Sequence, residues 1–185
     1  MGEQHKKHSR REHLNDFHLN VAGEYVYDGA LYACQNDDAK QRRSKRAVWG
    51  MAAILTVAVA AGGCIPAPGM QNCFYVLLPY LGEFLGAASV IWALAKLGTD
   101  WSTVREYNYK KSVAVLPVRT AVTAVFSNLG IVCELIFFFV NDHAGQTFFA
   151  LLYVLLKLIA LLSVLVLRAE IMQAEWGKLP KKDNS

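Results

Sequence analysis

The stretch TFFALLYVLLKLIALLSVLVL, residues 147–167, contains a single ionisable side chain, Lys157. At about 1.5 Å of rise per helical residue, a run of this length matches the roughly 30 Å hydrocarbon thickness of a bilayer. A soluble helix would instead place polar residues on one face with a period of 3.6. The stretch therefore predicts a membrane-spanning helix.

Three further runs share these properties and cover about 47–64, 74–95 and 120–140. Charged residues crowd outside the four runs, into residues 1–46, into the segment from Lys96 to Arg119, and after position 167. This distribution is typical of a polytopic membrane protein. The predicted fold is all-α, with four antiparallel transmembrane helices in one domain over residues 47–168.

The basic residues predict the orientation of the chain. Nine Lys or Arg precede the first run, five lie in or beside the segment between the second and third runs, and four follow position 167. The two remaining loops, at 65–73 and 141–145, contain none. Because Lys and Arg accumulate on the cytoplasmic side, residues 1–46 and the tail 169–185 are both expected in the cytoplasm. The expected location is the cell membrane, with several passes.

A dense basic cluster directly precedes the first run and is interpreted as an anchor to lipid headgroups. Cationic side chains and an interfacial tryptophan at this depth favour contact with an anionic bilayer surface. The net charge of +4 is explained in this way, so no nucleic acid is expected as a partner. The predicted anchors are Arg42, Arg43, Lys45, Arg46 and Trp49.

The N-terminal segment contains one local signal for β-structure. Asp28-Gly29 stands between short runs that carry tyrosine and aliphatic residues, which is typical of a tight hairpin turn. A short β-hairpin is therefore expected within residues 21–33. An isolated hairpin is marginal in water, so it would need a surface to lie against.

The second run carries a row of small side chains at helical spacing: Gly82, Gly86, Ser89 and Ala93. Small residues allow two helix backbones to approach closely inside a membrane. The row predicts a helix-packing face. The expected partners are a second copy of the chain or another membrane protein.

Three ionisable residues fall inside the apolar runs: Glu83, Glu134 and Lys157. Counted from the helix ends, Glu83 and Lys157 lie roughly 14 Å deep and Glu134 roughly 9 Å deep. Lys157 can reach Glu83 if the second and fourth spans are neighbours, and it can also reach Glu134 on the third. Buried charges of opposite sign would partly neutralise each other.

Three interpretations of this charged cluster remain open. The charges form a structural ion pair that fixes how the helices dock. Alternatively, Glu83 or Glu134 binds a proton or cation in a transport cycle. In the third interpretation, one of the charges pairs with a different membrane protein.

Cys64 and Cys73 flank the first lysine-free loop. On the predicted topology both reach the outer face, where a disulfide could form and persist. Two unpaired thiols are the alternative, since the loop between them is short and contains two prolines. Cys34 and Cys133 are expected to be free thiols.

The sequence contains no recognisable catalytic or nucleotide-binding motif, and its His, Cys and carboxylate residues lack metal-ligand spacing. No cofactor or metal is therefore expected, and no enzyme activity. The leading hypothesis is a non-enzymatic accessory or scaffold subunit of a membrane complex. The alternative is a small proton- or cation-coupled transporter that uses the three intramembrane charges.

Overall fold

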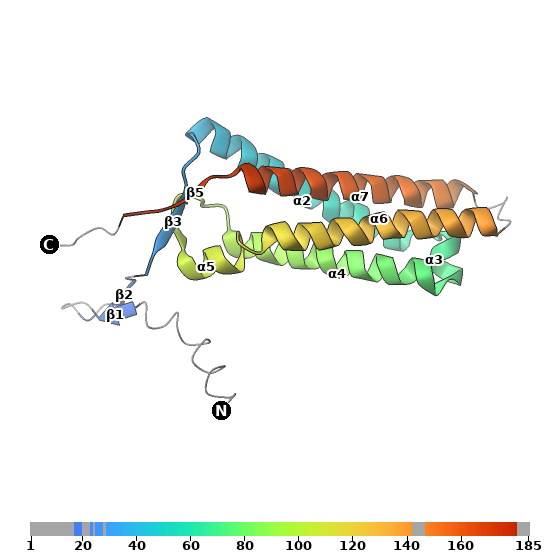
Figure 1. Ribbon diagram of the computed structural model, residues 1–185, viewed down its shortest axis with the longest axis horizontal. Helices are drawn as coiled ribbons and strands as arrows, with labels where there is room; N and C mark the ends of the chain where they lie inside the picture. Colours follow the sequence, from blue (N-terminus) through green and yellow to red (C-terminus); the bar gives the residue numbers. More distant parts are fainter. Residues whose placement is uncertain (1–16, 20–22, 24, 28, 142–146, 181–185) are drawn as a thin grey trace, which may run out of the picture.

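The structure, a computed structural model, describes residues 17–19, 23, 25–27, 29–141 and 147–180. Four long helices lie side by side in a bundle (Figure 1): α2 (Asp38–Cys64), α4 (Phe74–Leu97), α6 (Leu116–Val140) and α7 (Thr147–Gln173). Each is long and apolar enough to cross a membrane. The prediction of a mostly helical chain with four such helices is confirmed.

The helices extend beyond the apolar runs that predicted them. α2 begins at Asp38, so the basic cluster forms its first turns, and α7 continues to Gln173. Both extensions lie at the same end of the bundle (Figure 1). Regular helix is therefore not limited to the stretch that can lie in hydrocarbon, and charged residues occupy the projecting turns.

The four helices pack in a ring. α7 contacts α2 on one side and α6 on the other, α6 also contacts α4, and the α2–α4 contact that closes the ring is the least extensive. α4 and α7 therefore face each other across the diagonal. A short helix, α3 (Pro68–Asn72), joins α2 to α4 and packs against α4 and α6. Pro68 suits its first turn, where a backbone N–H would have no partner.

A small antiparallel sheet lies at the end of the bundle opposite α3 (Figure 1). Its central strand is β3 (Leu31–Cys34), flanked by β4 (Val104–Arg105) and β5 (Trp176–Lys178). β4 continues into helix α5 (Glu106–Lys111). We call this end of the bundle the sheet end and the opposite one the α3 end.

Aromatic side chains attach the sheet to the helices. The Tyr32 and Tyr109 rings stack at 4.3 Å, and Trp176 lies 5.9 Å from Tyr109 and 5.8 Å from Trp101 between ring centroids. Trp101 is only 1% exposed and belongs to the same apolar core as Leu94. Trp101 therefore packs inside the protein, and the half-buried Trp176 packs against the same core. Stacked and tilted aromatic pairs each contribute about 1 kcal/mol beyond area burial.

The turn that leads into β4 is stabilised by Asp100. Its Oδ1 accepts hydrogen bonds from the hydroxyl of Ser102 at 2.6 Å and from the Ser102 backbone N–H at 3.0 Å. These hydrogen bonds hold the pKa of the Asp100 carboxyl below its ordinary value. The turn places β4 beside β3.

Strand pairing differs from the hairpin predicted for residues 21–33. β2 (Tyr25–Tyr27) pairs with β1 (Phe17–Leu19), whereas β3 pairs with β4 and β5. The two runs on either side of Asp28-Gly29 thus belong to different sheets, and Asp28 itself lies outside the described residues. The prediction failed because the partners of β3 come from distant parts of the sequence.

The row of small residues on α4 faces α6. A Cβ atom added to Gly86 would lie 2.6 Å from the Thr123 hydroxyl and 3.2 Å from the Thr123 Cα, and one added to Gly82 would meet the Phe126 ring. Ser89 is half-buried in the same row, and Ala93 is fully buried in the core. The seam therefore serves packing within the chain.

We predict that Gly86→Ala destabilises the bundle by about 1–3 kcal/mol, because the added methyl group meets the backbone of α6. Gly50→Ala is the matched control, since nothing lies within 4 Å of its added Cβ. Thermal unfolding in mild detergent would measure both variants. Equal midpoints for the two would contradict the close α4–α6 approach.

Candidate functional site

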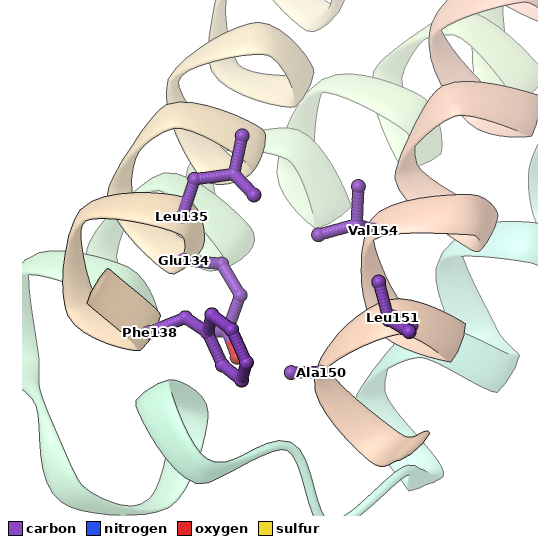
Figure 2. A pocket seen from close by; sticks show the side chains of 6 residues that line it. All are labelled: Glu134, Leu135, Phe138, Ala150, Leu151 and Val154. Atoms are coloured by element: carbon purple, nitrogen blue, oxygen red, sulfur yellow. The ribbon is translucent and has the colours of Figure 1, made fainter. Parts of the chain in front are cut away.

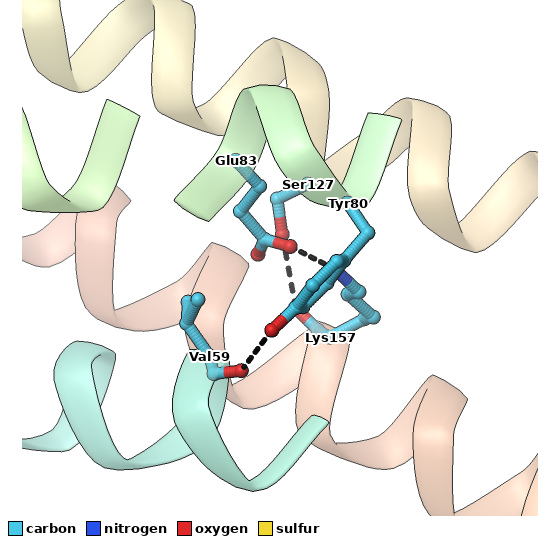
Figure 3. Close-up of polar contacts among 5 residues, drawn as sticks. All are labelled: Val59, Tyr80, Glu83, Ser127 and Lys157. Carbon is cyan, nitrogen blue, oxygen red and sulfur yellow. Dashed lines mark hydrogen bonds and ion pairs between the residues drawn. The ribbon is translucent and has the colours of Figure 1, made fainter. Parts of the chain in front are cut away.

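The centre of the bundle contains a buried ion pair between Glu83 of α4 and Lys157 of α7 (Figure 3). Glu83 is 0% exposed and Lys157 is 2% exposed. From the sequence, this contact was predicted only if the two helices were neighbours. They are instead diagonal, and the long lysine side chain crosses the core to reach the carboxylate.

Two tyrosines enclose the Lys157 ammonium. Its Nζ lies 4.6 Å from the ring centroid of Tyr80 and 5.1 Å from that of Tyr153. An aromatic face attracts a cation through its quadrupole, most strongly where water is absent. Tyr80 also donates a hydrogen bond of 3.4 Å from its hydroxyl to the backbone oxygen of Val59 on α2 (Figure 3).

Helix α6 supports the lysine from the side. The Ser127 hydroxyl donates a hydrogen bond of 3.2 Å to the backbone oxygen of Lys157. One turn further, a Cβ added at Gly130 would lie 3.5 Å from the Lys157 Cε, an ordinary contact distance, so α6 lies directly against the lysine stem there. Three helices therefore fix the position of the ammonium.

Glu134 of α6 is the second buried carboxylate, and it is 0% exposed. Among the described residues, its carboxylate oxygens have no side-chain hydrogen-bond partner, and the backbone of Gly69 lies against them. The backbone of Gly69 in α3 lies so close to this carboxylate that a Cβ there would collide with it. The hydroxyl of Tyr153 and the Glu83 Oε1 are likewise buried without a partner in the described part of the chain.

Acidic and basic groups are not equal in number in this cluster. Two fully buried carboxylates accompany one buried ammonium, and Lys157 forms its ion pair with Glu83. Burying an isolated charge in an apolar interior costs free energy. Electroneutrality therefore requires one bound proton or one cation on the two carboxylates. The geometry thus supports a structural pair and, beside it, a carboxyl group with spare capacity.

A small cavity opens beside Glu134 between α6 and α7 (Figure 2). Its volume of about 20 Å³ is enough for roughly one water molecule. Apart from Glu134, its walls are apolar side chains: Leu135, Phe138, Ala150, Leu151 and Val154. The cavity can hold a water molecule or an apolar side chain of similar size.

The cysteines have no disulfide in the structure. Cys34, Cys64, Cys73 and Cys133 are free thiols, and Cys64 is exposed. The Cys73 backbone N–H donates to the Gly69 oxygen at the end of α3, which places Cys73 at the start of α4. Within the described residues, no group of three His, Cys, Asp or Glu could hold a metal ion.

The predicted anchors lie on the projecting turns of α2. Arg42, Arg43 and Arg46 are exposed, and Lys45 is half-buried. Trp49 differs, because it packs against the apolar core and its indole N–H is shielded. The three arginines are thus accessible at the surface, whereas Trp49 mainly contributes to packing.

Sequence reasoning missed Tyr80, Tyr153 and Gly130 as members of the cluster. Tyr80 precedes Glu83 by three positions and Tyr153 precedes Lys157 by four. Helical side chains lean towards the helix N-terminus, so an aromatic residue one turn earlier is well placed to cover a buried charge. The spacing of three or four residues between each tyrosine and the charged residue could therefore have predicted their contact. Gly130 could be assigned only once α6 was known to face Lys157.

No protein-family model matches the chain, and searches of curated proteins and of solved structures likewise found no significant match.

We predict that Glu83→Gln lowers the free energy of unfolding by about 3–5 kcal/mol, because Lys157 would keep a buried charge without a partner. The exchanged pair Glu83→Lys with Lys157→Glu should recover part of this loss. Chemical or thermal unfolding in detergent measures both. A swap that is no more stable than Glu83→Gln would argue against a mainly structural pair.

Proposed function

We propose that the protein is a non-enzymatic accessory or scaffold subunit of a membrane complex. The observation that supports this most directly is the use of the interior polar groups to join the helices to each other. Scaffold proteins need a rigid frame, whereas carriers need helices that can move apart. The proposal places the four helices across a membrane.

Polar contacts near the sheet end join three pairs of helices. The Ser44 hydroxyl of α2 donates to the Glu170 carboxylate of α7 at 2.7 Å, and the Arg119 guanidinium of α6 donates to the Ser89 oxygen of α4 at 2.6 Å. Arg168 of α7 donates to the backbone oxygen of Pro117 on α6. Arg119 therefore makes a specific contact between helices.

The contacts at mid-height complete this set. Tyr80 joins α4 to α2, Ser127 joins α6 to α7, and the Glu83–Lys157 pair joins α4 to α7 across the diagonal. Each helix pair that is adjacent in the ring is thus connected by at least one polar contact. Interhelical hydrogen bonds in membranes contribute about 0.6–2 kcal/mol each, so together they oppose sliding of the helices.

The proposed orientation places the sheet end in the cytoplasm of a cell membrane. The exposed Arg42, Arg43 and Arg46 and the basic residues of α5 lie towards this end. The α3 end carries no Lys or Arg in its short helix α3. This asymmetry supports cytoplasmic placement of the segments before α2 and after α7.

We predict that the protein purified in mild detergent has a mass above that of one chain of 20.5 kDa, after correction for detergent. The excess should correspond to further copies or to a stoichiometric membrane partner. Mass determination of the intact complex, with identification of every co-purified protein, measures this. A monomer without a partner would contradict the accessory proposal.

Proton- or cation-coupled transport is the second candidate function. The observation that favours it is the Glu134 carboxyl, which is buried close to the α3 end without a side-chain hydrogen-bond partner among the described residues. A carboxyl group of this kind can take up and release a proton or a small cation.

On this alternative, Glu134→Gln should abolish solute-coupled proton or sodium flux in proteoliposomes while the unfolding midpoint changes little. The neutral amide keeps the shape but cannot exchange a proton. Cys133→Ser is the control, since it alters the neighbouring residue of α6 without removing the carboxyl. Absence of any ion flux by the wild-type protein would exclude this candidate.

A further inference from the structure

Asn128 stands out among the residues that point away from the bundle. It is exposed and lies halfway along α6, twelve positions from each end of the helix. No described residue forms a hydrogen bond with its side-chain amide. If the helices span a membrane, as proposed above, Asn128 faces hydrocarbon near the midplane. In hydrocarbon neither the NH₂ nor the oxygen of a primary amide finds a hydrogen-bond partner, which costs several kcal/mol.

The other helices contain no comparable residue among those described. The middle of α4 and of α7 presents only apolar side chains outward, such as Leu85 and Leu158. On α2, Thr56 is exposed, but its hydroxyl donates to the Ala52 oxygen of the same helix at 2.8 Å. Asn128 is therefore an exposed polar side chain at the middle of a long helix, and its hydrogen-bonding groups have no partner among the described residues.

The surroundings of Asn128 suit helix packing. Exposed side chains on α6 recur at alternating intervals of four and three residues, and we call them the α6 stripe: Val118, Val122, Val125, Leu129, Val132 and Ile136. Similar spacing occurs on the outer faces of α4 and α7, but the α6 stripe is mostly valine. β-branched side chains are rigid at χ1, so they lose little entropy when they pack.

We propose that the α6 stripe is the contact surface for a second copy of this chain, with the two Asn128 amides bonded to each other. This proposal rests on the membrane subunit function proposed above. Two copies inserted in one membrane share the same orientation, so their α6 helices run parallel. A two-fold axis normal to the membrane then brings each Asn128 to the depth of its counterpart.

The amide group is complementary to its own copy. Its NH₂ donates and its oxygen accepts, so the partial charges of two amides related by a two-fold axis match in pairs. A different protein would need a polar residue at this depth by its own sequence, whereas a second copy always supplies one.

Disulfide cross-linking in membranes tests the contact directly. The four native cysteines are replaced by serine, and single cysteines are introduced at Val125 or Val132 in the stripe, or at Leu162 on the outer face of α7 as control. Oxidation should give cross-linked dimers at both stripe positions and little at Leu162. Equal cross-linking at all three positions, or none in the stripe, would overturn the proposal.

Asn128→Leu should weaken the dimerisation constant by about 3- to 30-fold, as expected for loss of an interhelical hydrogen bond. Asn128→Gln should retain most of the affinity, and Thr56→Val should leave it unchanged. Förster transfer between labelled copies in vesicles measures all three. An unaltered constant in Asn128→Leu would overturn the proposal. A complex with a different protein, without contact between two copies of this chain, would also overturn the dimer proposal. It would still be consistent with the accessory function.

Discussion

A single ammonium group in the middle of an apolar bundle imposes the strongest constraint on this structure. Lys157 is buried on α7 and does not reach water, so its ammonium requires a buried anion as partner. Glu83 supplies that anion from the helix diagonally opposite, and the pair fixes both the separation and the rotation of α4 and α7. A rotation of either helix by one residue position, about 100°, would separate the two charges.

The remaining elements are arranged around this pair. Gly82 and Gly86 bring α4 close to α6, and Ser127 bonds α6 to the backbone oxygen of Lys157. Tyr80 covers the ammonium and also bonds to α2. The interior thus combines close backbone contacts, which need small residues, with polar contacts, which need partners at matching depth. Both requirements select the same packing order of the helices.

The sequence predicted the helical runs because hydrocarbon length and charge exclusion act on each segment by itself. It also identified Glu83, Glu134 and Lys157, since ionisable residues are conspicuous in such runs. The helix order and the diagonal pairing depend on three-dimensional packing and could not be read from spacing. The sheet escaped prediction for a related reason: β3 finds its partners near Val104 and Gly177, far along the chain.

That sheet has a consequence for the order of synthesis. β3 precedes the first long helix, whereas β5 follows the last one, so more than 140 residues separate paired Cys34 and Trp176. The β3 edge that pairs with β5 therefore stays open until the last long helix has been synthesised, whereas the β3 edge that pairs with β4 can close earlier. Such long-range closure is slow compared with local helix formation. The pairing of β3 with β5 is therefore the last to form. It requires the start of α2 and the end of α7 to lie at the same end of the bundle.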